Sequence, residues 1–433
     1  MLPPLRIVST GLRRTTETLA AELGRAPAAS EEPGWNEAEW RLAMAVAVAH
    51  GVSPLLSRLP AWRHAPWRKF LDTQREHVRL RHARIAALLS DIDVQARAAG
   101  IGLVALKGAA LHAQGEYAAG ERPMADIDLL VHECDQPAAK ALLERLGYVE
   151  SFAQWKHRVF KPVAGEAKAG FGEHRDTPVN IELHARIQER LPIATIDITH
   201  LVQPRACESG LNAYPSRGAL MSHLLLHAAG NLCGRSLRLI HLHDIARLAR
   251  RMDAQDWDLL CGAPAAAGWA WPPLFLAARY YGDVAPAGVM ARLEAACPRL
   301  LRIVARRQTL TDVSCSALWL QAFGGIEWSR SAREALRYVE QRIRPSAEAR
   351  QERADMIRTQ AELVDAIRPI LGGQDAAVQG AVLVELLSIW LAGHHPNMRV
   401  EVLATFINAV SAMVPVSEAQ MADRLPWMQH EPR

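Results

Sequence analysis

Two neighbouring segments constrain the fold of this chain more than any other feature. Residues 103–106 form a short apolar run that leads into Gly108 and a helix-forming stretch, and a second apolar run, 127–131, begins beside Asp126 and Asp128. Side chains alternate between the two faces of a strand, so the two aspartates point the same way. Adjacent carboxylates repel each other unless a divalent cation lies between them, and Mg²⁺ or Mn²⁺ takes such oxygen ligands. The pattern predicts a strand, turn, helix and strand that carry a metal site.

The turn between these strands is suited to bind a phosphate group. A glycine turn before a helix presents backbone N–H groups, and Gly108 occupies such a turn. Ala109 follows it and has no hydroxyl, so Lys107 and Arg122 are the side chains expected to supply charged phosphate contacts. The two segments together indicate a site for a metal ion and a phosphate group.

A third segment, Ile181-Glu-Leu-His184, completes a recognisable order of motifs. Lys107-Gly108, then Arg122 with Asp126-Ile-Asp128, then this strand resemble the polymerase-β-like nucleotidyltransferase superfamily, in particular the bacterial uncharacterised nucleotidyltransferase family 5. Residues 49–56 and 239–246 also resemble that family, so the similarity spans roughly the first 250 residues.

The resemblance implies two-metal transfer of a nucleotidyl group. The residues implied as catalytic and as ligands of Mg²⁺ or Mn²⁺ are Asp126, Asp128 and Glu182, with Glu182 also helping to take the acceptor proton. The residues implied to bind the nucleotide are Lys107, Gly108, Arg122, His184 and Asp244. His184 shares a strand face with Glu182, so it is expected either to touch metal or acceptor or to be a hydrogen-bonded scaffold residue.

The pattern of apolar residues predicts where helices and strands lie. Apolar positions at helical spacing extend over residues 35–50 and 67–99, and Gly100 ends the second stretch. Short apolar runs then alternate with helices, and the strand-like runs are 103–106, 127–131, 148–152, 157–162 and 179–185. After Leu191, amphipathic stretches separated by prolines predict helices throughout.

These elements predict an α+β fold in three parts. Residues 1–99 form an N-terminal helical region, and residues 100–195 form a small mixed-sheet core of the nucleotidyltransferase kind. Residues 196–433 form a large C-terminal helical region. Inside the core, residues 163–178 are rich in glycine and charge, and we expect a mobile loop that closes over the acceptor or an insertion without a role.

Two clusters of polar residues allow more than one interpretation. The predicted helix 67–99 carries a stripe that is either a solvated face or a basic face for an anionic acceptor; its members are Arg75, His77, Arg79, Arg81, His82 and Arg84. Further along, His223 and His227 share a helix face and His241 and His243 follow. A zinc site can be drawn from these histidines, but the sequence does not specify a fourth ligand. Packing or the lining of a nucleotide cleft fits better because the family resemblance extends through this region.

Composition excludes several classes of protein. The 433 residues are 50% hydrophobic and 22% charged, and a formal net charge of +4 predicts no general nucleic-acid binding. No apolar run reaches the length of a membrane span. The six cysteines show no Cys-x-x-Cys spacing and are expected to be reduced and buried, which indicates a cytoplasmic protein.

Three functions remain open from the sequence. The first is transfer of a nucleoside monophosphate from an NTP to a hydroxyl of a small molecule, peptide, protein or RNA. The second is metal-dependent glycosyl transfer from a nucleotide sugar in peptide natural-product tailoring, because Asp-x-Asp also binds Mn²⁺ and a diphosphate. The third is a non-catalytic nucleotide-binding module, which the missing hydroxyl at Ala109 favours and the three retained carboxylates disfavour.

Overall fold

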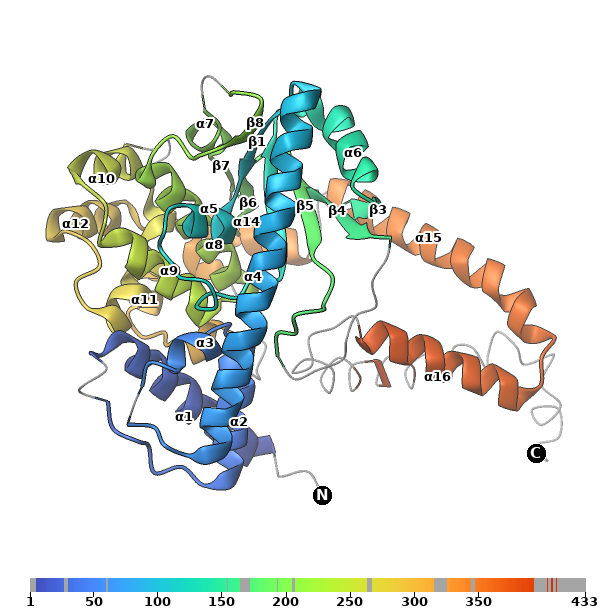
Figure 1. The fold of residues 1–433 in the computed structure, drawn as a ribbon, viewed down its shortest axis with the longest axis horizontal. Helices are drawn as coiled ribbons and strands as arrows, with labels where there is room; N and C mark the ends of the chain where they lie inside the picture. The colour runs from blue at the N-terminus through green and yellow to red at the C-terminus, as the bar shows by residue number, and fades with distance from the viewer. Residues whose placement is uncertain are drawn as a thin grey trace. The chain divides into compact units, whose positions relative to one another are not determined.

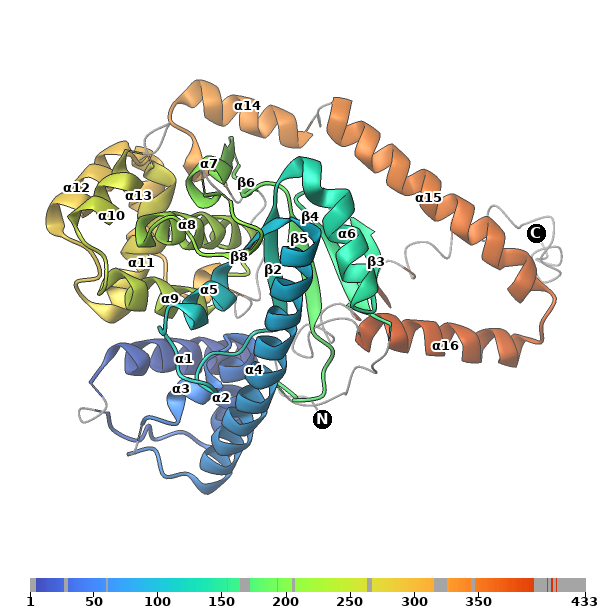
Figure 2. The same cartoon turned by 45° about the horizontal axis from the view of Figure 1, so that its top comes forward.

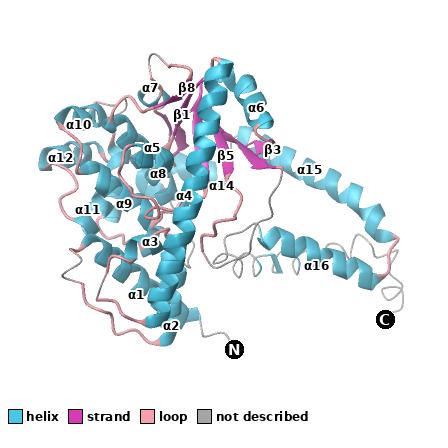
Figure 3. Ribbon diagram, viewed as in Figure 1, coloured by secondary structure: helices cyan, strands magenta, loops and turns pink. Residues whose placement is uncertain are grey.

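The computed structural model describes residues 5–26, 30–59, 61–153, 155–163, 172–192, 194–204, 207–262, 267–314, 325–343 and 347–392, with 403, 406, 407 and 410. The chain divides into two compact units, Met1–Arg344 and Pro345–Arg433. The first combines a mixed six-stranded sheet with many helices, as Figure 3 shows. The second contains the helices α15 (Ala347–Gly372) and α16 (Ala376–Ala392). The predicted α+β fold class is confirmed.

The first hundred residues are helical, as predicted. The elements are α1 (Leu5–Gly24), α2 (Glu37–Ala49), α3 (Ser53–Leu56) and α4 (Ala65–Ala99). Helix α2 begins with a capping box in which Asn36 and Glu39 each accept the other's backbone N–H. Helix α4 ends at Gly100, whose φ of 69° suits a residue without a side chain. Figure 1 shows α4 as the long helix that runs across the sheet.

The sheet has the strand order β3-β4-β5-β2-β1-β8. Its strands are β1 (Gly102–Ala105), β2 (Asp126–Val131), β3 (Tyr148–Ala153), β4 (His157–Pro162), β5 (Asn180–His184) and β8 (Gly210–Asn212). Strand β1 pairs with β2 in antiparallel orientation, whereas β2 pairs with β5 in parallel orientation. Strand β4 is antiparallel to both β5 and β3. The short helix α5 (Lys107–Ala113) connects β1 to the segment before β2.

The two faces of the sheet belong to two separate hydrophobic cores. Leu129, Phe160 and Ile181 lie on the face that packs against α4 and α6 (Gln136–Arg145). Figure 2 shows these two helices beside the strands. Val104 and Leu130 lie on the other face and join the core of the helical region. Because Asp126 and Asp128 alternate with Leu129 along β2, they lie on this second face.

The remaining elements of the first unit are mostly helical. The helices are α7 (Thr199–Val202), α8 (Arg217–Gly234), α9 (Leu239–Ala249), α10 (Ala254–Cys261), α11 (Trp271–Tyr281), α12 (Ala287–Ala296), α13 (Arg299–Ala305) and α14 (Ala332–Ile343). Single 3-10 turns lie at Glu133–Asp135, Gly268–Ala270, Thr311–Val313 and Ile326–Trp328. Strands β6 (Gln188–Arg190) and β7 (Thr195–Asp197) form a separate antiparallel pair.

One strand of the main sheet contradicts the prediction that the chain is helical after Leu191. Strand β8 pairs in parallel with β1 at the edge of the sheet. The Leu211 N–H donates to Asp93 Oδ1 on α4 at 2.7 Å, and a side chain on Gly210 would collide with the same helix. Three residues are too few to show strand periodicity, so this element depends on a partner that is distant in the sequence.

The prediction that the cysteines are buried is wrong for most of those described. Only Cys297 is buried; Cys134 and Cys207 are exposed, and Cys233 and Cys261 are partly exposed. All five are unpaired. Cys233 and Cys261 nevertheless pack against the hydrophobic core of the helical region. None of the described helices combines the length and apolar character needed to cross a bilayer.

The two flanking segments that resemble the family lie against each other. His50 ends α2 and is fully buried, and its Nδ1 accepts the Leu239 N–H at 2.9 Å. The His50 carbonyl accepts the Ile240 N–H at 3.2 Å. Arg238 Nε donates to the Ala49 carbonyl at 2.9 Å. The start of α9 is therefore held by the end of α2, 189 residues away in the chain.

Acid is expected to destabilise the protein partly through His50. Burial lowers the pKa of His50 to about 3, whereas the unfolded chain takes up this proton near pH 6.5. The contribution to stability is therefore complete above pH 6.5 and is lost as the pH falls toward 3. Between pH 7.5 and 5 the loss should be about 2 kcal/mol, and urea unfolding at the two pH values measures it.

The control for this prediction is a pair of matched variants. His50→Asn keeps a side-chain acceptor for Leu239 and should lose about 2 kcal/mol less than the wild type between the two pH values. His132 is exposed. His132→Asn should show the same pH dependence of stability as the wild type. If His50→Asn also keeps the wild-type pH dependence, His50 is not the group responsible.

Candidate functional site

Three carboxylates come together on the face of the sheet that meets the helical region. The parallel pairing of β2 with β5 places Asp128 directly opposite Glu182, and Asp126 lies two residues earlier on β2. Their side chains share one face because strand residues alternate. This register is the feature that joins the two carboxylate motifs, which are 54 residues apart in the sequence.

Asp128 is the best-paired of the three carboxylates. Lys107 Nζ lies 2.8 Å from Asp128 Oδ1, and His184 Nε2 lies 3.0 Å from the same oxygen. Burial alone would raise the pKa of Asp128, but the charge of Lys107 and the hydrogen bond from His184 hold it well below its usual value. Burial opposes the charge on Lys107, yet the attraction of Asp128 and Asp126 raises its pKa. Asp128 is therefore ionised and Lys107 protonated at neutral pH.

Asp126 has the opposite electrostatic environment. Burial, followed by repulsion from Asp128 and from Glu182, raises its pKa to about 7. Lys107 offsets this only in part. The carboxylates of this face therefore carry more negative charge than the protonated side chains beside them neutralise. Such an arrangement suits the binding of a divalent cation.

A second histidine, His157, approaches the same carboxylates from the neighbouring strand. Strand β4 pairs with β5 so that His157 lies opposite His184. Glu182 Oε2 lies 3.5 Å from His157 Nδ1 and 3.6 Å from His184 Nε2. Among the described residues, these three form the one group whose ligand atoms all lie within 4.8 Å of one another. Imidazole ligands suit Fe²⁺, Ni²⁺, Cu²⁺ and Zn²⁺ better than Mg²⁺.

Sequence reasoning missed His157 because its contribution depends on strand order. The residue begins an alternating strand, but nothing in the sequence shows that this strand lies beside β5 rather than elsewhere in the sheet. The strand periodicity of residues 157–162 placed His157 and Val159 on one face of their strand. Only the pairing of β4 with β5 puts that face on the same side of the sheet as Glu182.

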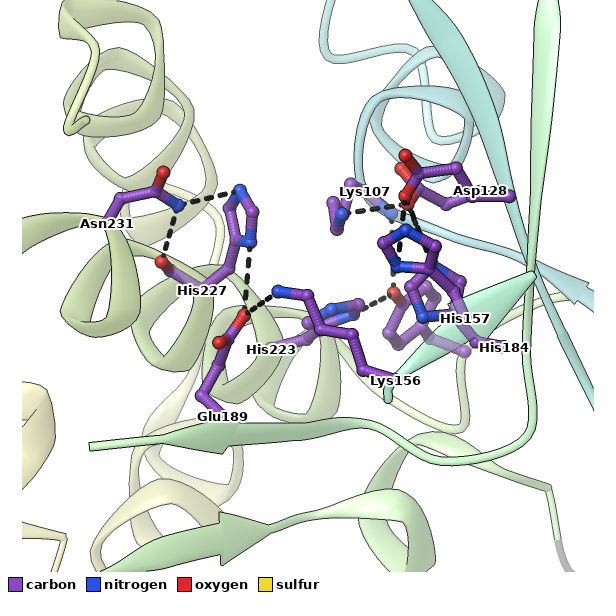
Figure 4. A network of polar contacts seen from close by, with 11 residues as sticks. Lys107, Asp128, Lys156, His157, His184, Glu189, His223, His227 and Asn231 are labelled. Carbon is purple, nitrogen blue, oxygen red and sulfur yellow. Dashed lines mark hydrogen bonds and ion pairs between the residues drawn. The ribbon is translucent and has the colours of Figure 1, made fainter. Parts of the chain in front are cut away.

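Helix α8 forms the opposite wall of the site, as Figure 4 shows. His223 and His227 on α8 line a small cavity together with Lys107, Lys156 and His184. The His223 Nδ1 atom lies 2.7 Å from the Tyr214 hydroxyl, and burial holds the pKa of both histidines well below its usual value. They are neutral polar groups that face the carboxylates across the cavity. Lining of a cleft is one of the two roles that the sequence favoured for these histidines over a zinc site, and they do line this cavity.

Arg122 and Asp244 were both predicted to bind the nucleotide, and in the structure their side chains pair with each other. Arg122 Nε lies 2.9 Å from Asp244 Oδ1, and Arg122 Nη2 lies 2.7 Å from Oδ2. The Tyr117 hydroxyl donates to the same carboxylate at 2.7 Å. All three side chains are buried. A Cβ on Gly108 would collide with Arg122 Nη1, so the glycine lets the guanidinium pack beneath the turn that carries Lys107.

Arg81 holds the two carboxylate strands at their beginnings. It is only 2% exposed, and it donates to the carbonyls of Met124 and Ala125, directly before β2. It also donates to the carbonyls of Thr177 and Pro178, before β5. Both interpretations of the arginine stripe, a solvated face and a basic face for an acceptor, are wrong for this residue. Burial against backbone carbonyls is a tertiary effect that helical periodicity does not reveal.

The predicted acceptor loop is described only in part. Residues 164–171 lie outside the described residues, so the prediction that they close over the acceptor remains a prediction. The rest of the segment contacts α4: the Glu173 N–H donates to Gln74 Oε1 at 2.9 Å, and Arg84 donates to the Arg175 carbonyl. The end of the loop is thus held beside the strand that carries Glu182.

Comparison with known proteins identifies the class that this fold and site define. Residues 36–283 match the family described as uncharacterised nucleotidyltransferase, and this segment runs from α2 to the end of α11. The match covers more than half of the chain and includes all three carboxylates. The protein belongs to this nucleotidyltransferase family. Family membership supports nucleotidyl transfer in general and implies a nucleotide donor. No curated protein and no solved structure matches the chain.

Proposed function

We propose that this protein transfers a nucleoside monophosphate from a nucleoside triphosphate to a hydroxyl acceptor on a small molecule, peptide, protein or RNA. The observation that carries the proposal is the pairing of β2 with β5. It places Asp126, Asp128 and Glu182 on one face of the sheet within reach of Lys107. Such a face supplies both the anionic ligands and the cationic phosphate contact that this reaction requires.

The residues of this face fit a divalent cation, Mg²⁺ or Mn²⁺. Burial, and after it repulsion from Asp128 and Glu182, raises the pKa of Asp126, and a bound cation would offset both effects. Asp126, Asp128 and Glu182 would hold the metal, and His157 and His184 could add imidazole ligands beside Glu182. A bound cation would stabilise the negative charge that develops on the phosphate oxygens.

The side chains of the protein have separate roles in this proposal. The protonated Lys107 binds the phosphates that leave, because its ammonium lies beside the carboxylates. Glu182 accepts the proton of the acceptor hydroxyl. His184 holds Asp128 Oδ1 in place, and Arg122 with Asp244 supports the Gly108 turn from below. His223 and His227 line the small cavity beside Lys107.

Binding of the four nucleoside triphosphates, measured by calorimetry with and without Mg²⁺ or Mn²⁺, tests the proposal. At least one should bind in a metal-dependent manner, and the Asp126→Ala/Asp128→Ala variant should lose that binding. Incubation with the bound nucleotide labelled at its α-phosphate should then label an acceptor and release pyrophosphate. Unchanged metal-dependent binding in the double variant would overturn the site. In a parallel incubation with a nucleotide sugar labelled in its sugar, a labelled acceptor and a released nucleoside diphosphate would instead establish glycosyl transfer.

Replacement of Lys107 is expected to weaken binding of the donor. Lys107→Met should raise the dissociation constant of the triphosphate tenfold to a hundredfold, about 1.4 to 2.8 kcal/mol, because a charge-assisted phosphate contact is lost. Lys107→Arg should restore most of the affinity. Lys140 pairs with Glu150 on β3 and offers a matched control. If Lys140→Met weakens binding as much as Lys107→Met does, the effect does not come from the site.

A further inference from the structure

A second cavity, separate from the carboxylate face, lies among α1, α3, α9 and α11. Its volume is about 370 Å³, within the range of small-molecule sites. It shares no lining residue with the cavity beside Lys107. Its wall contains the end of α1, the residues around Arg58, one face of α9 and Tyr281 at the end of α11.

The wall of this cavity carries an excess of positive charge. Arg25, Arg58, Arg247 and Arg250 line it, and Glu22 is the one acidic residue among the lining side chains. Glu22 already accepts from Arg25 at 2.6 Å and from Ser30 at 2.6 Å. Arg58 and Arg247 share a single carboxylate, that of Glu121. Arg250 makes no ion pair with any residue that the structure describes. Four guanidinium groups thus face two carboxylates.

Two buried polar groups on this wall have no partner within the described part of the chain. His243 is 9% exposed, and neither its Nδ1 nor its Nε2 has a hydrogen-bond partner. The buried hydroxyl of Tyr281 also has none. The two rings lie 5.5 Å apart, so the groups are neighbours. Buried polar groups are almost always hydrogen-bonded, so this pair indicates a ligand that supplies the missing bonds.

The chemistry of the wall specifies the ligand. Several guanidinium groups with a neutral imidazole and a hydroxyl suit a phosphate group, which offers two negative charges and three acceptor oxygens. Leu23, Leu55 and Leu59 also line the cavity, and inorganic phosphate alone would leave their apolar surface uncovered. A phosphate attached to a small organic group satisfies both kinds of side chain.

We propose that this cavity is a second binding site, for a phosphate monoester of a small organic molecule. Arg58, Arg247 and Arg250 bind the phosphate oxygens, His243 and Tyr281 complete the hydrogen bonds, and the leucines contact the organic group. The site is independent of the carboxylates, although α9 carries both His243 and the Asp244 that pairs with Arg122.

Calorimetry of the full chain in EDTA, with phenyl phosphate and ribose 5-phosphate as probes, tests this proposal. We expect at least one ester to bind more tightly than inorganic phosphate and than succinate. Arg250→Gln and His243→Phe should each weaken that binding at least tenfold, whereas Lys107→Met should leave it unchanged. Because Arg250 is exposed, its variant should fold normally, and a melting curve checks this.

The remaining outcomes would overturn the proposal. They are no binding of either ester, succinate binding as tightly as the esters, or ester binding that both cavity variants leave intact. Binding lost only in Lys107→Met would place the phosphate at the carboxylate face. Failure of the second site would leave the proposed transfer reaction untouched, since the two sites are tested with different variants.

Discussion

Asp128→Asn is expected to lower the rate of nucleotidyl transfer about a thousandfold, equivalent to about 4 kcal/mol of transition-state stabilisation. The substitution removes the charge of a carboxylate that lies opposite Glu182 and receives Lys107 at 2.8 Å, but it keeps the size of the side chain. Both the metal ligand and the partner of the phosphate-binding lysine are affected. Single-turnover measurements with labelled triphosphate would report the loss.

A matched control separates the site from general effects of the substitution. Asp258 on α10 is 72% exposed and pairs with Arg292 at 3.1 Å, so Asp258→Asn should keep full activity. Glu182→Gln, on the partner strand, should reproduce the loss caused by Asp128→Asn. Transfer at the wild-type rate in folded Asp128→Asn protein would show that this carboxylate is not part of the machinery.

Arg81→Met is expected to lower the free energy of unfolding of the first unit by about 3 to 5 kcal/mol. The substitution leaves the carbonyls of residues 124, 125, 177 and 178 without their buried donor and removes the partner of Glu173, which lies 3.6 Å away. The same backbone segments lead into Asp126 and Glu182. Urea unfolding followed by tryptophan fluorescence measures the stability.

Arg79 provides the control for this prediction on the same helix. Its side chain is 52% exposed and forms a surface pair with Glu76 at 2.8 Å. Arg79→Met should leave the urea midpoint of unfolding close to that of the wild type. Similar losses in the two variants would show that the carbonyl contacts of Arg81 contribute little, and that α4 depends on its arginines for another reason.

Local periodicity was sufficient to predict the elements that carry the site. Strand alternation placed Asp126 and Asp128 on one face, and the apolar runs located the strands β1 to β5. These predictions succeed because alternation and helical spacing are properties of a few consecutive residues. The order of the Lys-Gly, Asp-x-Asp and Glu-x-His motifs was sufficient for the family, which the match over residues 36–283 confirms.

Contacts between segments that are distant in the sequence could not be predicted from local periodicity. Arg122 and Asp244 were each predicted to bind the nucleotide, and no local pattern showed that they form a buried pair, with Asp244 on α9 beside the guanidinium that packs against Gly108. Arg81 looked like part of a charged helix surface, yet it is buried because the segments before β2 and β5 end on α4. Strand β8 exists only because Asp93 and β1 lie beside it.

The sequence alone therefore determined the element types, the motif order and the shared face of Asp126 and Asp128. The tertiary structure decided which strand lies beside β2, and hence that Glu182, His184 and His157 meet those aspartates. The physical reason is that strand register and helix docking are settled by the burial of whole apolar faces. The residues that meet there are tens of positions apart, for example 54 for Asp128 and Glu182, beyond the reach of any local pattern.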